Sequence, residues 1–342
     1  MAFLFAIVIL GCSKTSAPDT FRAEYVLGTL CRIDLFENGS AGLYSMLFTR
    51  LSELDRIFSA NREDSGLAMI SRSAGLEPVR ISPELFTVLE RSLYYAEVSG
   101  GAFDPTLGPL IKLWGIGTEN PRIPSDGEIR NTLDLVDWRD LELTGTGGTE
   151  RTAFLKKQGM SLDLGAIAKG YAADELAGLL QANGIPRALI DLGGNIYVWG
   201  KKASGGPWRI GVQDPTDVRG TYAGVLEMKE SISVVSAGKY ERYFTGIDGN
   251  RYHHIMELQE TGGNRQGYPV ENNLLSVTVI AFSSMDADAL STSCFALGYE
   301  KGLDLAKANG AEILFIFENK TIRGSAGALE AFSASGDYRV IY

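Results

Sequence analysis

Two oxygen-bearing side chains near the start of an apolar segment could bind a cation together. Asp288 and Thr292 are four residues apart, so on a helix their oxygens lie on one face. A carboxylate and a hydroxyl suit Mg²⁺, which takes oxygen ligands and keeps water or phosphate oxygens in its remaining positions. The alternative is that these residues, with Asp286 and Ser291 beside them, only cap the helix, which is their commoner role. The spacing alone leaves both interpretations open.

A second segment places a positive charge at the start of another predicted helix. Asp163 is followed by Gly165 and Lys169. Free N–H groups at a helix N-terminus bind anions, and the lysine would add a point charge. The spacing fits neither a Walker motif nor a dinucleotide fingerprint, so it predicts only an anion site. A glycine-rich loop at 99–105 holds Phe103, which could flank a flat ligand or belong to a plain glycine turn.

Imidazole chemistry is restricted to one adjacent pair, because His253 and His254 are the only histidines. On a strand, neighbouring side chains point to opposite faces. One of the two could therefore reach a site while the other packs inside. The alternative is that neither histidine has a chemical role.

The composition excludes several classes of protein. Hydrophobic residues make up 45% of the 342 residues and charged residues 22%, which favours a packed core over disorder. The net charge is −10, and no run of basic residues offers a surface for nucleic acid. Glycine accounts for 40 residues, about 12%, against a usual share of about 7%. The chain should therefore contain many tight turns and backbone-lined sites, and it should be neither a coiled coil nor a multipass membrane protein.

Hydrophobic periodicity and turn residues predict a mixture of helices and strands. We expect helices at about 43–58, 82–100, from 125, 165–183, 285–297 and 303–309. We expect strands at about 28–36, 141–143, 153–156, 188–199, 208–212, 222–228, 231–235, 274–282 and 312–317, with a hairpin turn at 247–251. The elements do not alternate strictly and no repeat is found. The sequence therefore predicts an α+β fold in one compact unit.

The N-terminus has the features of an export signal. Residues 2–11 are all apolar, a run too short for a membrane span of about 20 residues but typical of a signal peptide. Ile9-Leu10-Gly11-Cys12 resembles a bacterial lipobox, in which the cysteine carries lipid. We therefore expect a signal peptide at 1–11, lipidation at Cys12, a tether at 12–20 and a folded unit at 21–342. A buried first strand is the alternative. Whether Cys31 and Cys294 form a disulfide is left open.

Four segments in one order resemble a known family. They are Gly101 to Thr106, Asp163 to Gly170, Tyr252 to Ile255, and Ala287 to Thr292. Their order and spacing resemble the ApbE family of FAD:protein FMN transferases, from about residue 28 to the C-terminus. The resemblance implies a T-fold-like α+β unit of mixed, mostly antiparallel sheets packed with helices.

The resemblance also implies the chemistry. Family members bind FAD and Mg²⁺ and attach FMN through a phosphoester to a threonine of an acceptor protein, releasing AMP. It implies that Asp288, Thr292 and the main-chain carbonyl of Ala166 bind Mg²⁺, and that His254 is the catalytic base. The FAD contacts that it implies are Leu27, Asn61, Ala102, Phe103, Asp104, Asp163, Lys169 and Ile255.

Some positions depart from the family pattern. Asn61 stands where the family often has a large aromatic residue that stacks on adenine. Ser236-Ala237-Gly238 replaces the usual T-S-G, and the loop from Met256 to Gly262 is one residue longer and lacks a proline. Asp286 is an additional acid near the expected metal.

Three functions therefore stay open. The leading one is Mg²⁺-dependent transfer of FMN from FAD to an acceptor protein by an enzyme lipid-anchored to a bacterial inner membrane on its periplasmic side. The second is hydrolysis of FAD to FMN and AMP, which the loss of the aromatic at Asn61 would favour. The third is a flavin-binding lipoprotein without turnover, although storage requires neither a metal nor a base.

Overall fold

A nine-stranded sheet forms the centre of the molecule. The computed structural model describes residues 21–145, 150–218, 220–259 and 266–342. The strand order is β1-β2-β6-β7-β10-β13-β14-β15-β17, and every pair is antiparallel except β15–β17. The strands are β1 (Phe21–Val26), β2 (Thr29–Leu35), β6 (Ala188–Leu192), β7 (Asn195–Trp199), β10 (Ile232–Gly238), β13 (Leu274–Ala281), β14 (Glu312–Phe317), β15 (Thr321–Gly324) and β17 (Arg339–Val340).

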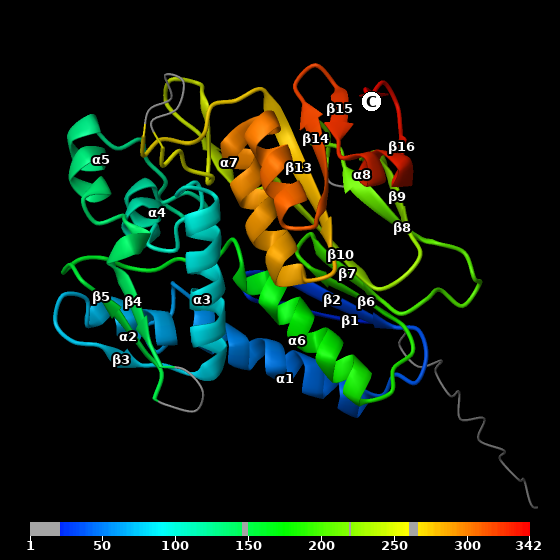
Figure 1. The fold of residues 1–342 in the computed structure, drawn as a ribbon, viewed down its shortest axis with the longest axis horizontal. Helices are drawn as coiled ribbons and strands as arrows, with labels where there is room; N and C mark the ends of the chain where they lie inside the picture. The colour runs from blue at the N-terminus through cyan, green and yellow to red at the C-terminus, as the bar shows by residue number, and fades with distance from the viewer. Residues whose placement is uncertain (1–20, 146–149, 219, 260–265) are drawn as a thin grey trace, which may run out of the picture.

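The central strands of this sheet are buried on both faces: their successive side chains point to opposite sides, and each side packs into a hydrophobic core. Val235 joins a core that includes residues of the helices α6 (Ala168–Ala182) and α7 (Ser284–Ala308), whereas its neighbour Val234 joins a second core. That second core lies under the small sheet β16-β9-β8 and a short helix. These elements are β8 (Trp208–Gln213), β9 (Tyr222–Met228), α8 (Ala326–Ala331) and β16 (Phe332–Ala334). Figure 1 shows α6 and α7 in front of the sheet.

Most of the remaining elements gather at the end of the molecule away from β8 and β9, whereas the helix α1 lies beside α6 (Figure 1). A third, smaller core forms there around Trp114, with Leu110, Ile116, Ile129 and Met256. The elements are α1 (Ala41–Phe58), α2 (Gly66–Arg72), β3 (Val79–Arg80), α3 (Pro83–Val98), α4 (Gly108–Trp114), α5 (Asp126–Leu133), the 3₁₀ turn η1 (Trp138–Asp140), β4 (Leu141–Thr144), β5 (Thr152–Leu155), β11 (Tyr243–Thr245) and β12 (Arg251–His253). The predicted α+β fold of mostly antiparallel sheets is confirmed.

Local capping explains why several helices begin where the sequence predicts. The hydroxyls of Ser40 and Ser82 accept from the main-chain N–H three residues ahead at the starts of α1 and α3. At α5, Ser125 and Glu128 form a reciprocal capping box. These caps depend on neighbouring residues only, which makes them readable from the sequence.

Other elements differ from the expectation. The strand expected at 188–199 is a hairpin, β6 and β7, that turns at Gly193-Gly194, where both residues have positive φ. The helix expected from 165 begins at Ala168. The two helices expected at 285–297 and 303–309 agree with the structure, because α7 is broken at Gly298, where φ is 75°. The helices α2 and α4 were not predicted, because each has only seven residues and little periodicity.

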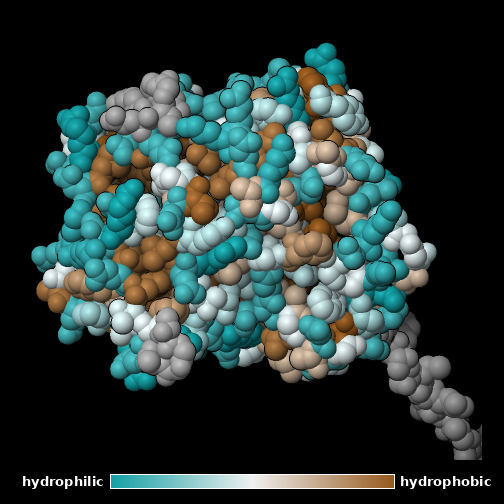
Figure 2. Space-filling model, in the orientation of Figure 1, coloured by the Kyte–Doolittle hydropathy of each residue, from teal (hydrophilic) through white to brown (hydrophobic). Residues whose placement is uncertain are grey.

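The surface is mainly polar. On the face drawn in Figure 2, hydrophilic residues surround smaller hydrophobic areas. Within the described part of the chain, no helix combines the length and the apolar character that a membrane crossing needs.

Cys31 and Cys294 are both free and buried. The expected signal peptide at 1–11 and the tether at 12–20, with Cys12, lie outside the residues that the structure describes.

Candidate active site

One cavity gathers residues from all four motif segments. It is bordered by the loop after α3, the turn before α6, the end of β12 and the first turns of α7. Of the predicted site residues, it is lined by Ala102, Phe103, Asp104, Asp163, Ala166, Lys169, His254, Ile255, Asp288 and Thr292. Sequence reasoning did not single out further lining residues: Leu107, Ile111, Ile116, Gly193, Gly194, Asn195, Val235, Glu241, Arg242 and Met256. Three of them, Gly193, Gly194 and Asn195, form a Gly-Gly-Asn tripeptide that could have indicated a turn at the site.

The start of α7 is fixed to α6 by one partly buried carboxylate. Asp174 of α6 accepts from the main-chain N–H of Ser284 at 2.8 Å and from that of Met285 at 2.9 Å, and it also binds the cap residue Ser283. Burial raises the pKa of Asp174 to about 6. Because these N–H groups have no partner inside the helix, Asp174 both satisfies them and holds the helix in place.

The two helices cross at a glycine. The main-chain N–H of Gly170 donates to Oδ2 of Asp288 at 3.0 Å, so α6 directly orients the carboxylate of α7. A Cβ at position 170 would lie 2.2 Å from the carbonyl oxygen of Ser284, which only glycine avoids. In a regular helix the same N–H would donate to the carbonyl of Ala166, four residues earlier. The crossing therefore leaves that carbonyl without a main-chain partner in the part of the chain that the structure describes.

Three oxygens of different kinds are available for a cation. Asp288 is 3% exposed and lines the cavity. The Ala166 carbonyl and the Thr292 hydroxyl also border the cavity, and neither has a hydrogen bond to any described residue. By contrast, the hydroxyls flanking Thr292 in the sequence, those of Ser291 and Ser293, both donate to carbonyls of their own helix.

These donors fit Mg²⁺. The ion prefers a few protein oxygens, often one or two carboxylates, and completes its shell with water and phosphate. No group of three or more His, Cys, Asp and Glu side chains that could hold a metal occurs among the described residues. A site here would therefore rely on one carboxylate, Asp288, with the Thr292 hydroxyl and the Ala166 carbonyl.

A lysine lies beside this carboxylate. Nζ of Lys169 is 3.5 Å from Oδ1 of Asp288 and donates to the carbonyl of Gly165 at 3.0 Å. Oδ1 of Asp163 accepts from the main-chain N–H of Gly165 at 2.8 Å, which shapes the turn before α6. The turn thus holds a positive charge at the cavity wall, where a phosphate group could bind.

The histidines point to opposite sides, as expected. His254 lines the cavity, and its Nδ1 lies 3.2 Å from the main-chain carbonyl of Arg242. Because a carbonyl only accepts, Nδ1 must donate, and in the neutral ring Nε2 keeps its lone pair. Burial, and then the positive charge of Arg242, lower the pKa of His254 to about 3. His253 instead packs edge-on against Phe295, and burial lowers its pKa to about 4.

The glycine-rich loop is held by side-chain hydrogen bonds. Oδ1 of Asp104 accepts from the main-chain N–H and the hydroxyl of Thr106, and Oδ2 accepts from the main-chain N–H of Trp138. Burial raises the pKa of Asp104 to about 6. This carboxylate is therefore occupied within the protein, where it fixes the shape of the loop that carries Phe103.

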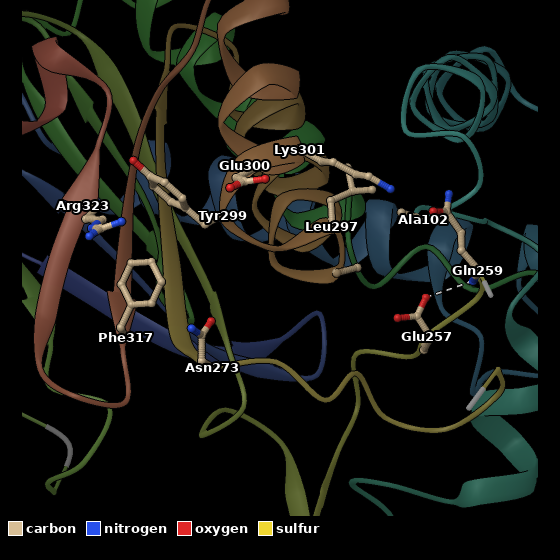
Figure 3. Close-up of a pocket in the computed structure, with 11 residues that line it drawn as sticks. Ala102, Glu257, Gln259, Asn273, Leu297, Tyr299, Glu300, Lys301, Phe317 and Arg323 are labelled. Carbon is tan, nitrogen blue, oxygen red and sulfur yellow. Dashed lines mark hydrogen bonds between the residues drawn. The ribbon is translucent and has the colours of Figure 1, made fainter. Parts of the chain in front are cut away.

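A second hollow adjoins the first at Ala102. Figure 3 shows it between the broken region of α7, at Leu297 to Lys301, and the strands that carry Phe317 and Arg323. Gln259 lies at the end near Ala102 (Figure 3). Its side chain donates to the carbonyls of Ser99 and Gly100. Gln259 therefore ties the segment after Met256 to the glycine loop.

Three predicted residues lie apart from the cavity wall. Asn61 is exposed in the turn after α1, and Leu27, with φ of 55°, forms the turn of the β1–β2 hairpin. Neither lines the cavity. The Leu27 turn is nevertheless close, because a Cβ on Gly193 would meet Oγ1 of Thr29 at 2.2 Å. Asp286 forms an ion pair with Arg91 of α3 at 2.6 Å and is not among the residues that line the cavity.

Comparison with known proteins identifies the family. A model of the ApbE family matches residues 27–315. The chain belongs to the ApbE family. Among curated relatives, the FAD:protein FMN transferase of Treponema pallidum is 41% identical over 324 residues, covering 90% of this chain and 87% of the relative. That of Klebsiella pneumoniae is 35% identical, covering 92% and 95%.

Solved structures of the family share the fold. The ApbE protein of Thermotoga maritima superimposes with a TM-score of 0.80 at 30% identity, covering 91% of this chain and 98% of that one. The flavin transferase ApbE of Vibrio cholerae gives a TM-score of 0.78 at 27% identity, with the same coverage. The predicted family is thereby confirmed.

Proposed function

We propose that this member of the ApbE family transfers FMN from FAD to a threonine hydroxyl of an acceptor protein and releases AMP. Relatives named FAD:protein FMN transferase, one of them 41% identical to this chain, support the transfer of FMN from FAD to a protein. The structural observation that supports it most is the pair of oxygens of Ala166 and Thr292 that have no partner among the described residues, beside Asp288 and in one cavity with Lys169 and His254. A binding protein without turnover would need neither this set nor a base.

The transfer is a displacement at phosphorus. The threonine oxygen of the acceptor forms a bond to the phosphorus of the FMN half, and the bond from that phosphorus to the bridging oxygen of the pyrophosphate breaks. AMP leaves with the bridging oxygen. Nε2 of His254 accepts the proton of the threonine hydroxyl, because its Nδ1 is bound to the Arg242 carbonyl. Lys169 stabilises the negative charge that develops on the phosphate oxygens.

The protein would hold Mg²⁺ through the Asp288 carboxylate, the Thr292 hydroxyl and the Ala166 carbonyl. When bound, the ion would neutralise charge on the pyrophosphate and polarise its phosphorus. The Phe103 and Ile255 side chains would pack against the flat flavin or adenine rings, and Asp163 would keep the turn before α6 in shape. Asp104 would hold the glycine-rich loop at 99–105 in shape through its three hydrogen bonds within the protein.

Product analysis tests this function. FAD is incubated with the protein and Mg²⁺, with and without EDTA and with and without candidate acceptor proteins, and the products are separated by chromatography. We expect AMP release and covalent FMN on the acceptor, both lost with EDTA and with Asp288→Ala. Full activity of Asp288→Ala would refute the metal assignment. Asp304→Ala, a change on the same helix outside the cavity, is the matched control.

Hydrolysis of FAD is a second candidate, favoured by Asn61. This residue is exposed and stands where the family often has an aromatic, so it provides no stacking surface for adenine. Weaker retention of FAD or AMP would let water replace the threonine. FMN and AMP formed without any acceptor would support this activity. If Asn61→Tyr lowers it while transfer is retained, the loss of stacking is the cause.

We propose, from the N-terminal sequence alone, that the protein is exported and anchored. Lipidation at Cys12 would attach it to the periplasmic side of the inner membrane, where it would meet its acceptor. Mass spectrometry of the mature N-terminus tests this. A chain that begins at Cys12 with added acyl mass would support it, and an unprocessed N-terminus would contradict it.

A further inference from the structure

One side chain in the cavity wall has a hydrogen-bond donor without a protein partner. Asn195, the first residue of β7, is 1% exposed, and its Nδ2 makes no hydrogen bond to any described residue. Three other buried side-chain atoms share this property, those of Trp138, Arg187 and Ser276. Of the four, Asn195 alone lines the cavity. Buried amide groups are nearly always paired, so an unpaired donor here points to a missing partner.

The orientation of this amide is fixed by a chain of hydroxyls. The Ser284 hydroxyl donates to Oδ1 of Asn195 at 2.8 Å, and it accepts from the Ser233 hydroxyl at 2.8 Å. Because Oδ1 is engaged in this way, Nδ2 is the end left free. The main chain is held as well, since Asn195 pairs with Val235 in the central sheet. The donor therefore cannot turn away to find another partner.

The Asn195 amide lies towards the end of the cavity that carries Asp288 and Lys169, where a phosphate group could bind. Ser284, its partner, lies one helical turn before Asp288 on α7, and residues four apart share a helix face. On its other side, Asn195 follows the Gly193-Gly194 turn, which lies against Thr29 beside the Leu27 turn. A ligand that extends from Asp288 along this wall would pass the free donor.

We propose that Nδ2 of Asn195 donates a hydrogen bond to an acceptor oxygen of bound FAD. This inference rests on the proposed function, because it takes FAD as the ligand of the cavity. A neutral N–H donor suits either a phosphate oxygen or a carbonyl oxygen of the flavin ring. Asn195 thereby contributes to FAD affinity, and its other amide atom fastens the helix that carries Asp288.

Two variants separate contact with FAD from helix anchoring. Asn195→Asp keeps an oxygen for Ser284 but replaces the donor with an oxygen that repels an acceptor. Ser284→Ala removes the anchoring hydrogen bond but leaves the donor in place. Affinity is measured by titration calorimetry with Mg²⁺, using FAD, FMN, ADP and riboflavin, and chromatography afterwards verifies that the FAD is intact. Thermal unfolding is followed in parallel.

We expect Asn195→Asp to bind FAD roughly 10- to 100-fold more weakly than the unsubstituted protein. Ser284→Ala should weaken FAD binding clearly less than Asn195→Asp, because the amide keeps its donor and loses only the partner of Oδ1, while the unfolding temperature falls. If Asn195→Asp folds poorly, Asn195→Ala is compared with Ser284→Ala, since both lose the anchoring bond and only the first loses the donor.

The ligand series identifies the accepting oxygen. A loss confined to FAD, FMN and ADP assigns a phosphate oxygen, and a loss that extends to riboflavin assigns a flavin carbonyl. Equal FAD affinity in the unsubstituted protein and Asn195→Asp would overturn the inference, as would equal losses in Asn195→Ala and Ser284→Ala. Failure of the unsubstituted protein to bind FAD would instead refute the proposed function.

Discussion

Removal of one hydroxyl should separate metal binding from folding stability. The Thr292 hydroxyl lines the cavity and has no hydrogen bond to a described residue, whereas the next hydroxyl, that of Ser293, is buried and donates to the Ala289 carbonyl at 2.6 Å. Thr292→Val preserves the shape of the side chain and loses no protein hydrogen bond. Ser293→Ala loses one and leaves the cavity wall unchanged.

The magnitudes follow from these contacts. For Thr292→Val we expect a change of less than about 0.5 kcal/mol in the free energy of unfolding, because no protein partner is lost. For Ser293→Ala we expect a loss of about 0.5–1.5 kcal/mol, or roughly 1–4 °C in Tm. If Thr292 is a metal ligand, Thr292→Val should raise the Mg²⁺ concentration for half-maximal FAD turnover at least about tenfold, the lower limit for groups that merely support ligands.

The assay is FAD turnover measured against Mg²⁺ concentration, combined with thermal unfolding of both variants in EDTA. We expect Thr292→Val to keep its stability but to need more Mg²⁺ for FAD turnover. We expect Ser293→Ala to keep its Mg²⁺ dependence but to unfold at a lower temperature. If Thr292→Val keeps the unsubstituted Mg²⁺ dependence, the hydroxyl is not a ligand. If Ser293→Ala needs more Mg²⁺ instead, the hydroxyl that has no hydrogen bond to a described residue is not the one that binds the metal.

Two further predictions concern the base and the helix crossing. The pKa of His254 is lowered from 6.5 to about 3 in the native protein. As the pH drops, the unfolded chain therefore takes up this proton before the native protein does. His254 thus lowers the free energy of unfolding as the pH falls from about 6.5 towards 3. Urea unfolding across this range should show a smaller fall in His254→Gln, and kcat/KM should lack a His254-dependent limb near pH 6.5. Gly170→Ala places a Cβ 2.2 Å from the Ser284 carbonyl oxygen and should reduce both Tm and FAD turnover. Gly178→Ala, on the same helix with open space around it, should change neither, and equal behaviour of the two variants would contradict the crossing argument.

Much of the fold is determined locally and can be predicted from the sequence. Ser40, Ser82 and Ser125 each mark the start of a helix, because a cap involves only the next three residues. The hairpin of β6 and β7 was predicted as one strand, because its apolar residues run on across the turn. Gly193-Gly194 was the only signal of the turn, and two glycines do not indicate by themselves which way a chain folds.

Some of the site residues could likewise be predicted from the sequence, whereas the contacts of others could not. The order of the four motifs identified the family and half of the residues that line the cavity, since each motif is contiguous in the sequence. Sequence reasoning also placed Asp286 near the metal, whereas the structure pairs it with Arg91, 195 positions away. Leu27 and Asn61 lie outside the cavity wall, and their contacts with FAD remain predictions.

Only the tertiary structure decided which polar atoms are free. Among the described residues, the Ala166 carbonyl has no partner because Gly170 donates to Asp288, 118 positions away, and Nδ2 of Asn195 has none because Oδ1 accepts from Ser284, 89 positions away. Local pattern cannot show either fact, since each depends on two distant segments that meet when the helices pack on the sheet. The sequence by itself determined the family, the chemical groups and the local elements. Their pairing, and hence the atoms left for a metal and for FAD, follows from the packing.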